Sequence, residues 1–67
     1  MSIPVSHFRR RLESFINERH PNLKNAKRLI ATRSVQAAQA FSSAVLAGDS
    51  ETAARTKADA LLFEGLL

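Results

Sequence analysis

The sequence contains no cysteine, no tryptophan and no tyrosine, and its 67 residues include only two glycines and two prolines. Without cysteine the chain has neither a disulfide framework nor a thiolate metal site, which fits a reducing compartment. With only Gly48 and Gly65, it has no glycine-rich loop of the kind that cradles phosphate groups. A chain this short needs helix packing or a partner for its stability, and we expect residues 1–67 to form one small domain.

Long hydrophobic runs are also absent. The longest, Ala44–Ala47 and Ala60–Phe63, are far shorter than the roughly 20 residues with which a helix spans a bilayer. No secretory signal is visible, because Arg9–Arg11 follows the apolar stretch Ile3–Val5 instead of preceding it. We therefore expect a cytoplasmic protein that has no membrane partner.

Catalytic and metal-binding patterns are weak. His7 and His20 are the only histidines, and neither has an acidic residue beside it at the spacing of metal ligands. Glu13 and Glu18 fall on different faces of one predicted helix, so they do not form a carboxylate pair. The sequence thus predicts a protein without catalytic activity, metal or cofactor, in which His20 shapes the turn at Pro21.

Residues 5–19 carry the pattern of an amphipathic helix. Apolar side chains recur there at helical spacing, at Val5, Phe8, Leu12, Phe15 and Ile16. Pro21 should end the helix, because the residue before a proline avoids helical backbone angles. We therefore expect the first helix to run from about Val5 to about Arg19.

A second helix is predicted between Asn22, a good N-cap residue, and Gly48, which suits a left-handed C-cap. Its apolar stripe consists of Leu23, Ala26, Ile30, Ala37, Phe41, Ala44 and Val45. The stripe turns polar at Arg33 and Ser34. Two possibilities stay open: one continuous helix of up to about 25 residues, or a break near Asn25 or Thr32–Ser34.

The third predicted helix begins after the turn, where either Asp49 or Ser50 is the N-cap. Its stripe consists of Ala54, Ala58, Leu61 and Leu62. Gly65 should end the helix in the left-handed conformation, and a Schellman motif there would fold Leu66 back onto the last turn.

The fold class follows from these three helices. Residues with β-branched side chains are sparse and never alternate with polar ones, so no strand is predicted. We expect an all-α fold, either a three-helix antiparallel bundle or a helical hairpin plus one helix. Such a small bundle is either complete by itself or completed by a second copy.

The chain closes with LLFEGLL, Leu61 to Leu67, although chain ends are usually polar. An exposed apolar cluster of this size is a liability unless something covers it. We therefore predict a small protein–protein interaction module that self-associates or binds another helical protein. Its predicted contact residues are Leu61, Leu62, Phe63, Leu66 and Leu67, together with Phe41 and Val45.

Charge is unevenly distributed along this chain of net charge +4. Residues 1–33 contain eight basic and two acidic side chains, whereas residues 34–67 contain two basic and four acidic ones. The alternative hypothesis is therefore a basic nucleic-acid-binding accessory protein that contacts phosphates. Its contact residues would be Arg10, Arg11, Lys24, Lys27 and Arg28. No tyrosine or tryptophan is available to stack on bases.

A helix-turn-helix is a further interpretation of the segment around Gly48, since Ala44 lies four residues before this glycine. The residues toward the DNA groove would then be Glu51, Thr52, Arg55 and Thr56. The long preceding helix and the net acidic charge of this half of the chain argue against it. An ordinary helical hairpin turn is the favoured interpretation.

Three stretches carry a family resemblance. FRRRLESFINERHPNL contains a Ser14–Phe15 pair before a His20–Pro21 turn, and ATRSVQAAQAFSSAVLAG and ADALLFEGLL follow it. Together they resemble a Bacteroidetes family of short helical proteins of unknown function, whose members often lie on mobile elements. The resemblance covers nearly the whole chain and implies no catalytic residue. It implies either that the chain is the N-terminal part of a longer protein, or that a second copy covers LLFEGLL.

Overall fold

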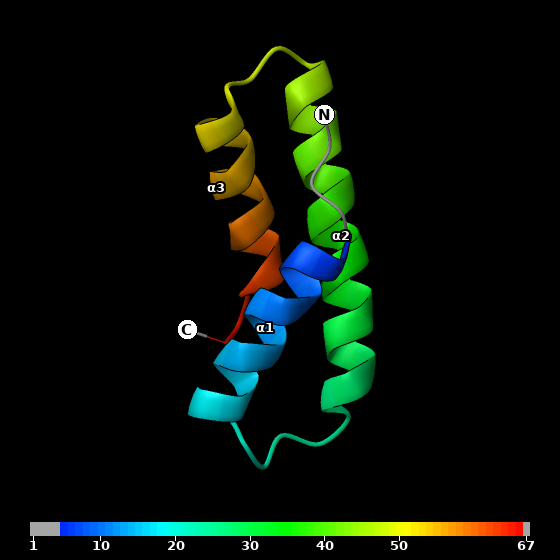
Figure 1. The fold of residues 1–67 in the computed structure, drawn as a ribbon, viewed down its shortest axis with the longest axis vertical. Helices are drawn as coiled ribbons and strands as arrows, with labels where there is room; N and C mark the ends of the chain where they lie inside the picture. Colours follow the sequence, from blue (N-terminus) through cyan, green and yellow to red (C-terminus); the bar gives the residue numbers. More distant parts are fainter. Residues whose placement is uncertain (1–4, 67) are drawn as a thin grey trace.

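The computed structural model describes residues 5–66, and within that range it consists of three helices and no strand. The helices are α1 (Val5–Arg19), α2 (Ala26–Leu46) and α3 (Glu51–Leu62). Figure 1 shows that α2 and α3 lie side by side as an antiparallel hairpin and that α1 crosses the lower half of this hairpin. The predicted all-α class is confirmed, in the form of a helical hairpin plus one helix.

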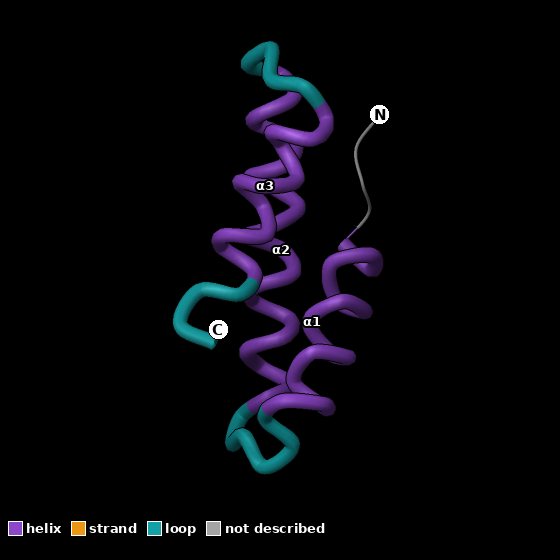
Figure 2. The backbone as a smooth tube through the Cα atoms, turned by 90° about the vertical axis from the view of Figure 1, so that its left-hand side faces the viewer, coloured by secondary structure: helices purple, strands orange, loops and turns teal. Residues whose placement is uncertain are grey.

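The central helix is α2, because it packs against both of the others. Figure 2 shows from the side that α1 lies along α2. The upper, N-terminal end of α1 lies well below the turn that joins α2 to α3. The described chain is elongated for this reason, with principal extents of 39 × 18 × 14 Å. Among residues 5–66, no third helix covers the upper part of the hairpin.

The bounds of α1 agree with the prediction, and the apolar stripe faces the core as its spacing required. Phe8, Leu12 and Ile16 are buried in α1, whereas Val5 at its first turn is 41% exposed. After the last helical residue the amide of His20 still donates to the carbonyl of Ile16 at 2.7 Å. The chain then leaves the helix at Pro21, where helical backbone angles are disfavoured for the preceding residue.

The second helix does not begin near Asn22, because α2 begins at Ala26, and of the two possible breaks the one near Asn25 is observed. Asn25 takes left-handed backbone angles, with φ of 60°, and its side chain makes no capping hydrogen bond. Asparagine tolerates this conformation better than most residues. The left-handed residue interrupts the helical path, so residues 20–25 form a loop in which the Leu23 amide donates to the His20 carbonyl at 3.1 Å.

The polar gap in the stripe does not break α2, which is continuous from Ala26 to Leu46. Ser34 lies fully buried in the core, and its hydroxyl donates to the carbonyl oxygen of Ile30 at 2.5 Å. A buried hydroxyl that bonds back to its own helix has a partner and carries little cost. Arg33 points instead toward the end of α3, as described below.

Gly48 forms the predicted left-handed C-cap, with φ of +99°. The Asp49 amide donates to Ala44 and the Gly48 amide donates to Val45, both at 3.0 Å, which is the Schellman pattern. Ser50 is the N-cap of α3, since its hydroxyl accepts from the Ala53 amide at 3.2 Å. In Figure 1, α2 and α3 form an antiparallel hairpin and do not cross at a wide angle. A helix-turn-helix requires such a wide crossing angle between its two helices.

The core consists of a few large apolar side chains and several alanines. Phe8 and Phe41 meet at its centre, with ring centroids 6.4 Å apart. The buried alanines are Ala37, Ala38, Ala44, Ala54 and Ala58. Such small side chains let α2 and α3 approach closely, so the hairpin buries little apolar volume of its own. Among the described residues, α1 contributes Phe8, Leu12 and Ile16 to the large side chains of the core, and the hairpin contributes Ile30, Phe41 and Leu62.

Candidate interaction surface

An arginine of α2 holds the C-terminal end of α3. The Arg33 guanidinium donates from Nη1 to the carbonyl oxygens of Leu61 at 3.0 Å and Glu64 at 2.9 Å. The last carbonyls of a helix have no partner within the helix, and a cation is favourable there. Arg33 therefore acts as the C-cap of α3 from a position 28 residues earlier in the chain.

The predicted Schellman motif at Gly65 is wrong, although Gly65 does take the left-handed conformation with φ of +76°. The amide of Leu66 donates to Phe63 at 3.0 Å and not to Leu61. The Leu61 carbonyl accepts instead from Arg33 and from the Glu64 amide. The residues after α3 thus form a tight turn whose shape depends on α2.

His20 holds the same turn from the α1–α2 loop. Its Nε2 lies 2.9 Å from the carbonyl oxygen of Leu66, and because a carbonyl only accepts, this nitrogen is the donor. The ring of His20 also packs against Phe15, with centroids 5.8 Å apart. The side chain of His20 therefore holds the turn after α3 and not only the turn at Pro21, and it links the α1–α2 loop to the C-terminal end of the described chain.

Aromatic and charged contacts from α1 reach Phe63, directly after α3. The rings of Phe15 and Phe63 meet edge to face with centroids 5.1 Å apart. The Arg11 guanidinium lies 5.6 Å from the centroid of Phe63 and forms an ion pair of 2.5 Å with Asp59 of α3. Asp59 therefore pairs with a side chain of α1.

The predicted protein interface changes in consequence. Phe41 and Leu62 are 1% and 0% exposed, so these two are corrected to core residues, because the chain itself already covers them. Val45, Phe63 and Leu66 are partly buried against the core. Leu61 keeps 38% of its surface exposed, and Leu67 lies outside the described residues.

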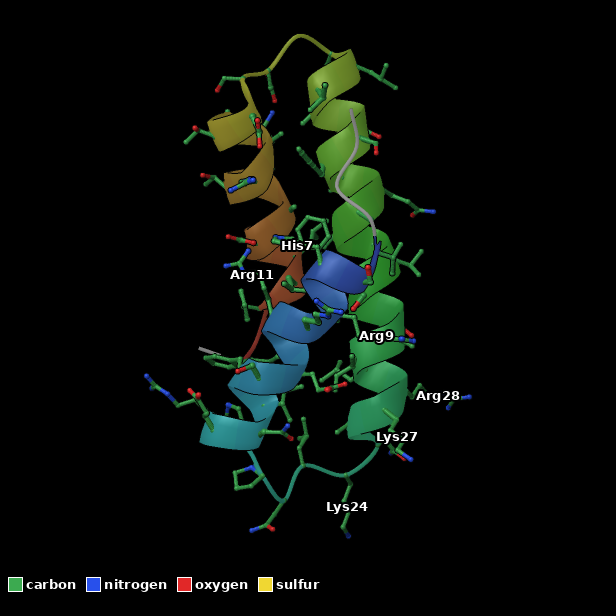
Figure 3. The ribbon with its side chains drawn as sticks, in the orientation of Figure 1. His7, Arg9, Arg11, Lys24, Lys27 and Arg28 are labelled. Carbon is green, nitrogen blue, oxygen red and sulfur yellow. The ribbon has the colours of Figure 1, made fainter. Side chains whose placement is uncertain are left out.

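The five basic residues of the alternative hypothesis do not form one patch. Figure 3 shows Lys24, Lys27 and Arg28 together at the lower end of the molecule, pointing outward, while Arg11 lies toward α3. Arg10 and Arg11 line one open hollow with Phe15 and Phe63, and Lys24 and Arg28 line another. The two hollows share no residue, and Arg11 already has Asp59 as its counterion.

One flank of α2 was not identified from the sequence. The fifteen residues from Ser34 to Gly48 include no charged side chain. Within them Leu46 is 87% exposed and Val35 is 44% exposed. Five residues at spacings of three and four share one side of the helix, and we call them the α2 flank: Ala31, Val35, Ala38, Ser42 and Leu46. Ala31, Val35 and Leu46 are exposed, whereas Ser42 is half-buried and Ala38 is buried against the core. The sequence feature that could have indicated this flank is the absence of charge over fifteen residues of a surface helix.

The lower end of α2 carries an apolar hollow of about 430 Å³. It is lined by Leu23, Lys24, Asn25, Arg28, Leu29 and Thr32. The hollow thus gives the start of α2 an exposed apolar surface with Lys24 and Arg28 at its rim, and none of the α2 flank residues lines it.

Other kinds of site were sought among residues 5–66. No group of three histidine, aspartate or glutamate side chains there is placed to hold a metal ion. Every buried side-chain nitrogen or oxygen in this range has a hydrogen-bond partner. No helix of the described chain is both long enough and apolar enough to cross a membrane.

Comparison with known proteins places the chain in a family. Its structure is similar to the crystal structure of protein PG0816 from Porphyromonas gingivalis, with a TM-score of 0.85 and 37% sequence identity. The match covers 92% of this chain and 42% of that one, so this chain spans less than half the length of PG0816. A search of curated proteins gave no match. The expected resemblance to a Bacteroidetes family is confirmed, while the link to mobile elements stays a prediction. Over residues 2–67, the chain belongs to the family described as Domain of unknown function (DUF1896).

Proposed function

We propose that this domain is a helical protein-interaction module, without catalytic activity, that self-associates through the α2 flank. The observation that carries the proposal is the exposure of Leu46 and Val35, at 87% and 44%, in a segment of fifteen residues without charge. The module would act in the cytoplasm, in keeping with a chain that has no cysteine.

The amino-acid composition of α2 supports the proposal that another helix covers its exposed side. A solvated helix normally carries charged residues on the face that points away from the core. α1 and α3 follow this rule, with Arg9 and Glu13 exposed on one and Glu51 and Lys57 on the other. The exposed side of α2 beyond Arg33 has only small, apolar or amide side chains. Contact with another helix would remove the apolar surface of such a helix from water, which is favourable.

The side-chain sizes also support close helix packing. Ala31 and Ser42 are small, and the larger Val35 and Leu46 each follow one of them by four residues. Small residues let a partner backbone approach, while the larger ones supply the apolar area that association removes from water. The chemistry that fits this surface is an uncharged helix of similar composition.

Two polar side chains near the C-terminal turn, those of His20 and Arg33, have structural partners. Arg33 donates to the end of α3, and His20 donates to Leu66. Both side chains therefore contribute to the C-terminal turn. The proposal assigns them to stability and not to chemistry.

Sedimentation equilibrium of two matched variants tests the proposal. Leu46→Asp puts a charge on the flank at a position so exposed that the monomer fold should not change. Ala47→Asp puts the same charge one residue further, on a different side of the helix end. We expect Leu46→Asp to be monomeric and Ala47→Asp to associate like the unmodified chain. Equal association of both variants would contradict the proposal.

A second candidate function is weak phosphate binding at the lower end of the molecule. Lys24, Lys27 and Arg28 gather there and point outward, as Figure 3 shows. Three cations without a stacking aromatic ring would give a sequence-independent contact that weakens with salt. Fluorescence anisotropy with a labelled duplex DNA tests it, with Lys24→Glu as the variant. No binding at low salt would exclude this function.

A further inference from the structure

We infer that the apolar hollow at the start of α2 binds an acidic peptide segment of a partner protein, one that presents an apolar side chain between carboxylates. This contact is separate from the proposed self-association, since none of the α2 flank residues lines the hollow. Two features meet at this place: an apolar surface, and a group of cations that has no counterion among residues 5–66.

Two leucines make the hollow apolar. Leu29 is half-buried against the core, and Leu23, in the α1–α2 loop, is 37% exposed. The hollow that they line is open to solvent and has a volume of about 430 Å³. An apolar side chain of a partner that enters it leaves water and covers both leucines at the same time, which is favourable.

The cations around the hollow determine the charge of the partner. Lys24 and Arg28 line the hollow, Lys27 precedes Arg28 directly, and Figure 3 shows all three pointing outward. The sequence has no acidic residue between Glu18 and Asp49. The ion pairs found in the described part of the chain join other groups: Arg11–Asp59, Arg55–Glu51 and Lys57–Asp49. The complementary partner is therefore acidic.

Polar groups in the lining favour a peptide over other anionic partners. The side chain of Asn25 makes no capping hydrogen bond, and Thr32 also lines the hollow. An amide and a hydroxyl can bond to the main chain of a peptide, whereas the alkyl chain of a lipid offers them no partner. Duplex DNA would bind the cations through its phosphates but has no apolar side chain with which to cover the leucines.

Fluorescence anisotropy with three labelled peptides tests this inference. The first peptide has leucines flanked by glutamates, the second has serines in place of the leucines, and the third has lysines in place of the glutamates. We expect the leucine–glutamate peptide to bind about tenfold more tightly than either of the others, because each of those lacks one of the two features. Absence of binding would overturn the inference, and so would equal binding of the serine–glutamate peptide.

Four variants locate the contact. Leu23→Ser should weaken binding of the leucine–glutamate peptide about tenfold through the lost apolar contact, and Arg28→Glu about fivefold through the lost ion pair. Leu46→Ser and Arg9→Glu make the same changes at exposed positions outside the hollow, and they should change the affinity little. Circular dichroism of each variant checks that the helices are intact. Equal weakening by the variants inside and outside the hollow would show that the peptide does not bind there.

Two other partners are outcomes of the same measurement. Duplex DNA and vesicles of phosphatidylglycerol are added in place of the peptide, to the unmodified chain and to the Leu23→Ser and Arg28→Glu variants. We expect both to bind more weakly than the leucine–glutamate peptide. Tighter binding of either one, dependent on Arg28 and not on Leu23, would assign this end of α2 to phosphate groups and overturn the inference.

Discussion

The Arg33 guanidinium of α2 donates a hydrogen bond of 3.0 Å to the carbonyl oxygen of Leu61, in the last turn of α3. The same nitrogen donates to Glu64 at 2.9 Å. One side chain thus closes the C-terminal end of the hairpin and sets the path of the chain after Leu62. It also explains why α2 keeps a charged residue at the edge of an otherwise apolar stripe.

Replacement of Arg33 by methionine should destabilise the fold. The variant keeps most of the apolar stem but leaves the Leu61 and Glu64 carbonyls without their charged donor. We expect the free energy of unfolding to fall by about 1–3 kcal/mol. Urea unfolding at one protein concentration measures it, with Lys27→Met as an exposed control that should change little. An Arg33→Met variant as stable as the unmodified chain would refute the cap.

Replacement of His20 by alanine should loosen the C-terminal turn locally. The variant removes the donor to the Leu66 carbonyl and the packing of the ring against Phe15. We expect faster hydrogen exchange at the Leu66 amide, which bonds to Phe63, with little change in the middle of α2. His7→Ala, at an exposed position, is the control. Unchanged exchange at Leu66 would show that His20 does not hold the turn.

Adjacent leucines should differ sharply in their importance. Leu62 is fully buried, so Leu62→Ala should cost about 2–5 kcal/mol of unfolding free energy. Leu61 is 38% exposed, and Leu61→Ala should cost clearly less. Thermal unfolding of the two variants compares them directly. Equal losses would mean that Leu62 is not the core residue that the structure places there.

The buried hydroxyl of Ser34 should be dispensable. Ser34→Ala removes a bond from the hydroxyl to the Ile30 carbonyl and introduces the best helix former, so stability should stay within about 0.5 kcal/mol. Ser34→Leu should lower it by about 1–3 kcal/mol, because the core at this point has no room for a larger side chain. Urea unfolding of both variants would show whether volume or polarity limits this position.

Local features of the fold were predictable from the sequence. The spacing of Phe8, Leu12 and Ile16 predicted α1 with the bounds that the structure shows. Gly48 and Ser50 marked the turn between α2 and α3, since each acts through bonds to its near neighbours. Periodicity and capping are properties of short segments, so one sequence is enough to read them.

Features that depend on distant residues were not predictable in the same way. The contact of Arg33 with Leu61 joins positions 28 apart, and no local pattern reveals it. The burial of Phe41 and Leu62 depends on where α1 lies, which their own segments do not reveal. The exposure of Leu46 also depends on the fold. The sequence shows only an apolar residue near a helix end, and the structure shows that nothing among the described residues covers it.

Sedimentation equilibrium of the unmodified chain, over a wide range of concentrations, tests self-association most directly. We expect a reversible monomer–dimer equilibrium that Leu46→Asp abolishes and that Leu61→Asp, on the far helix, leaves in place. A chain that stays monomeric at every concentration would contradict the claim that the α2 flank binds a second copy.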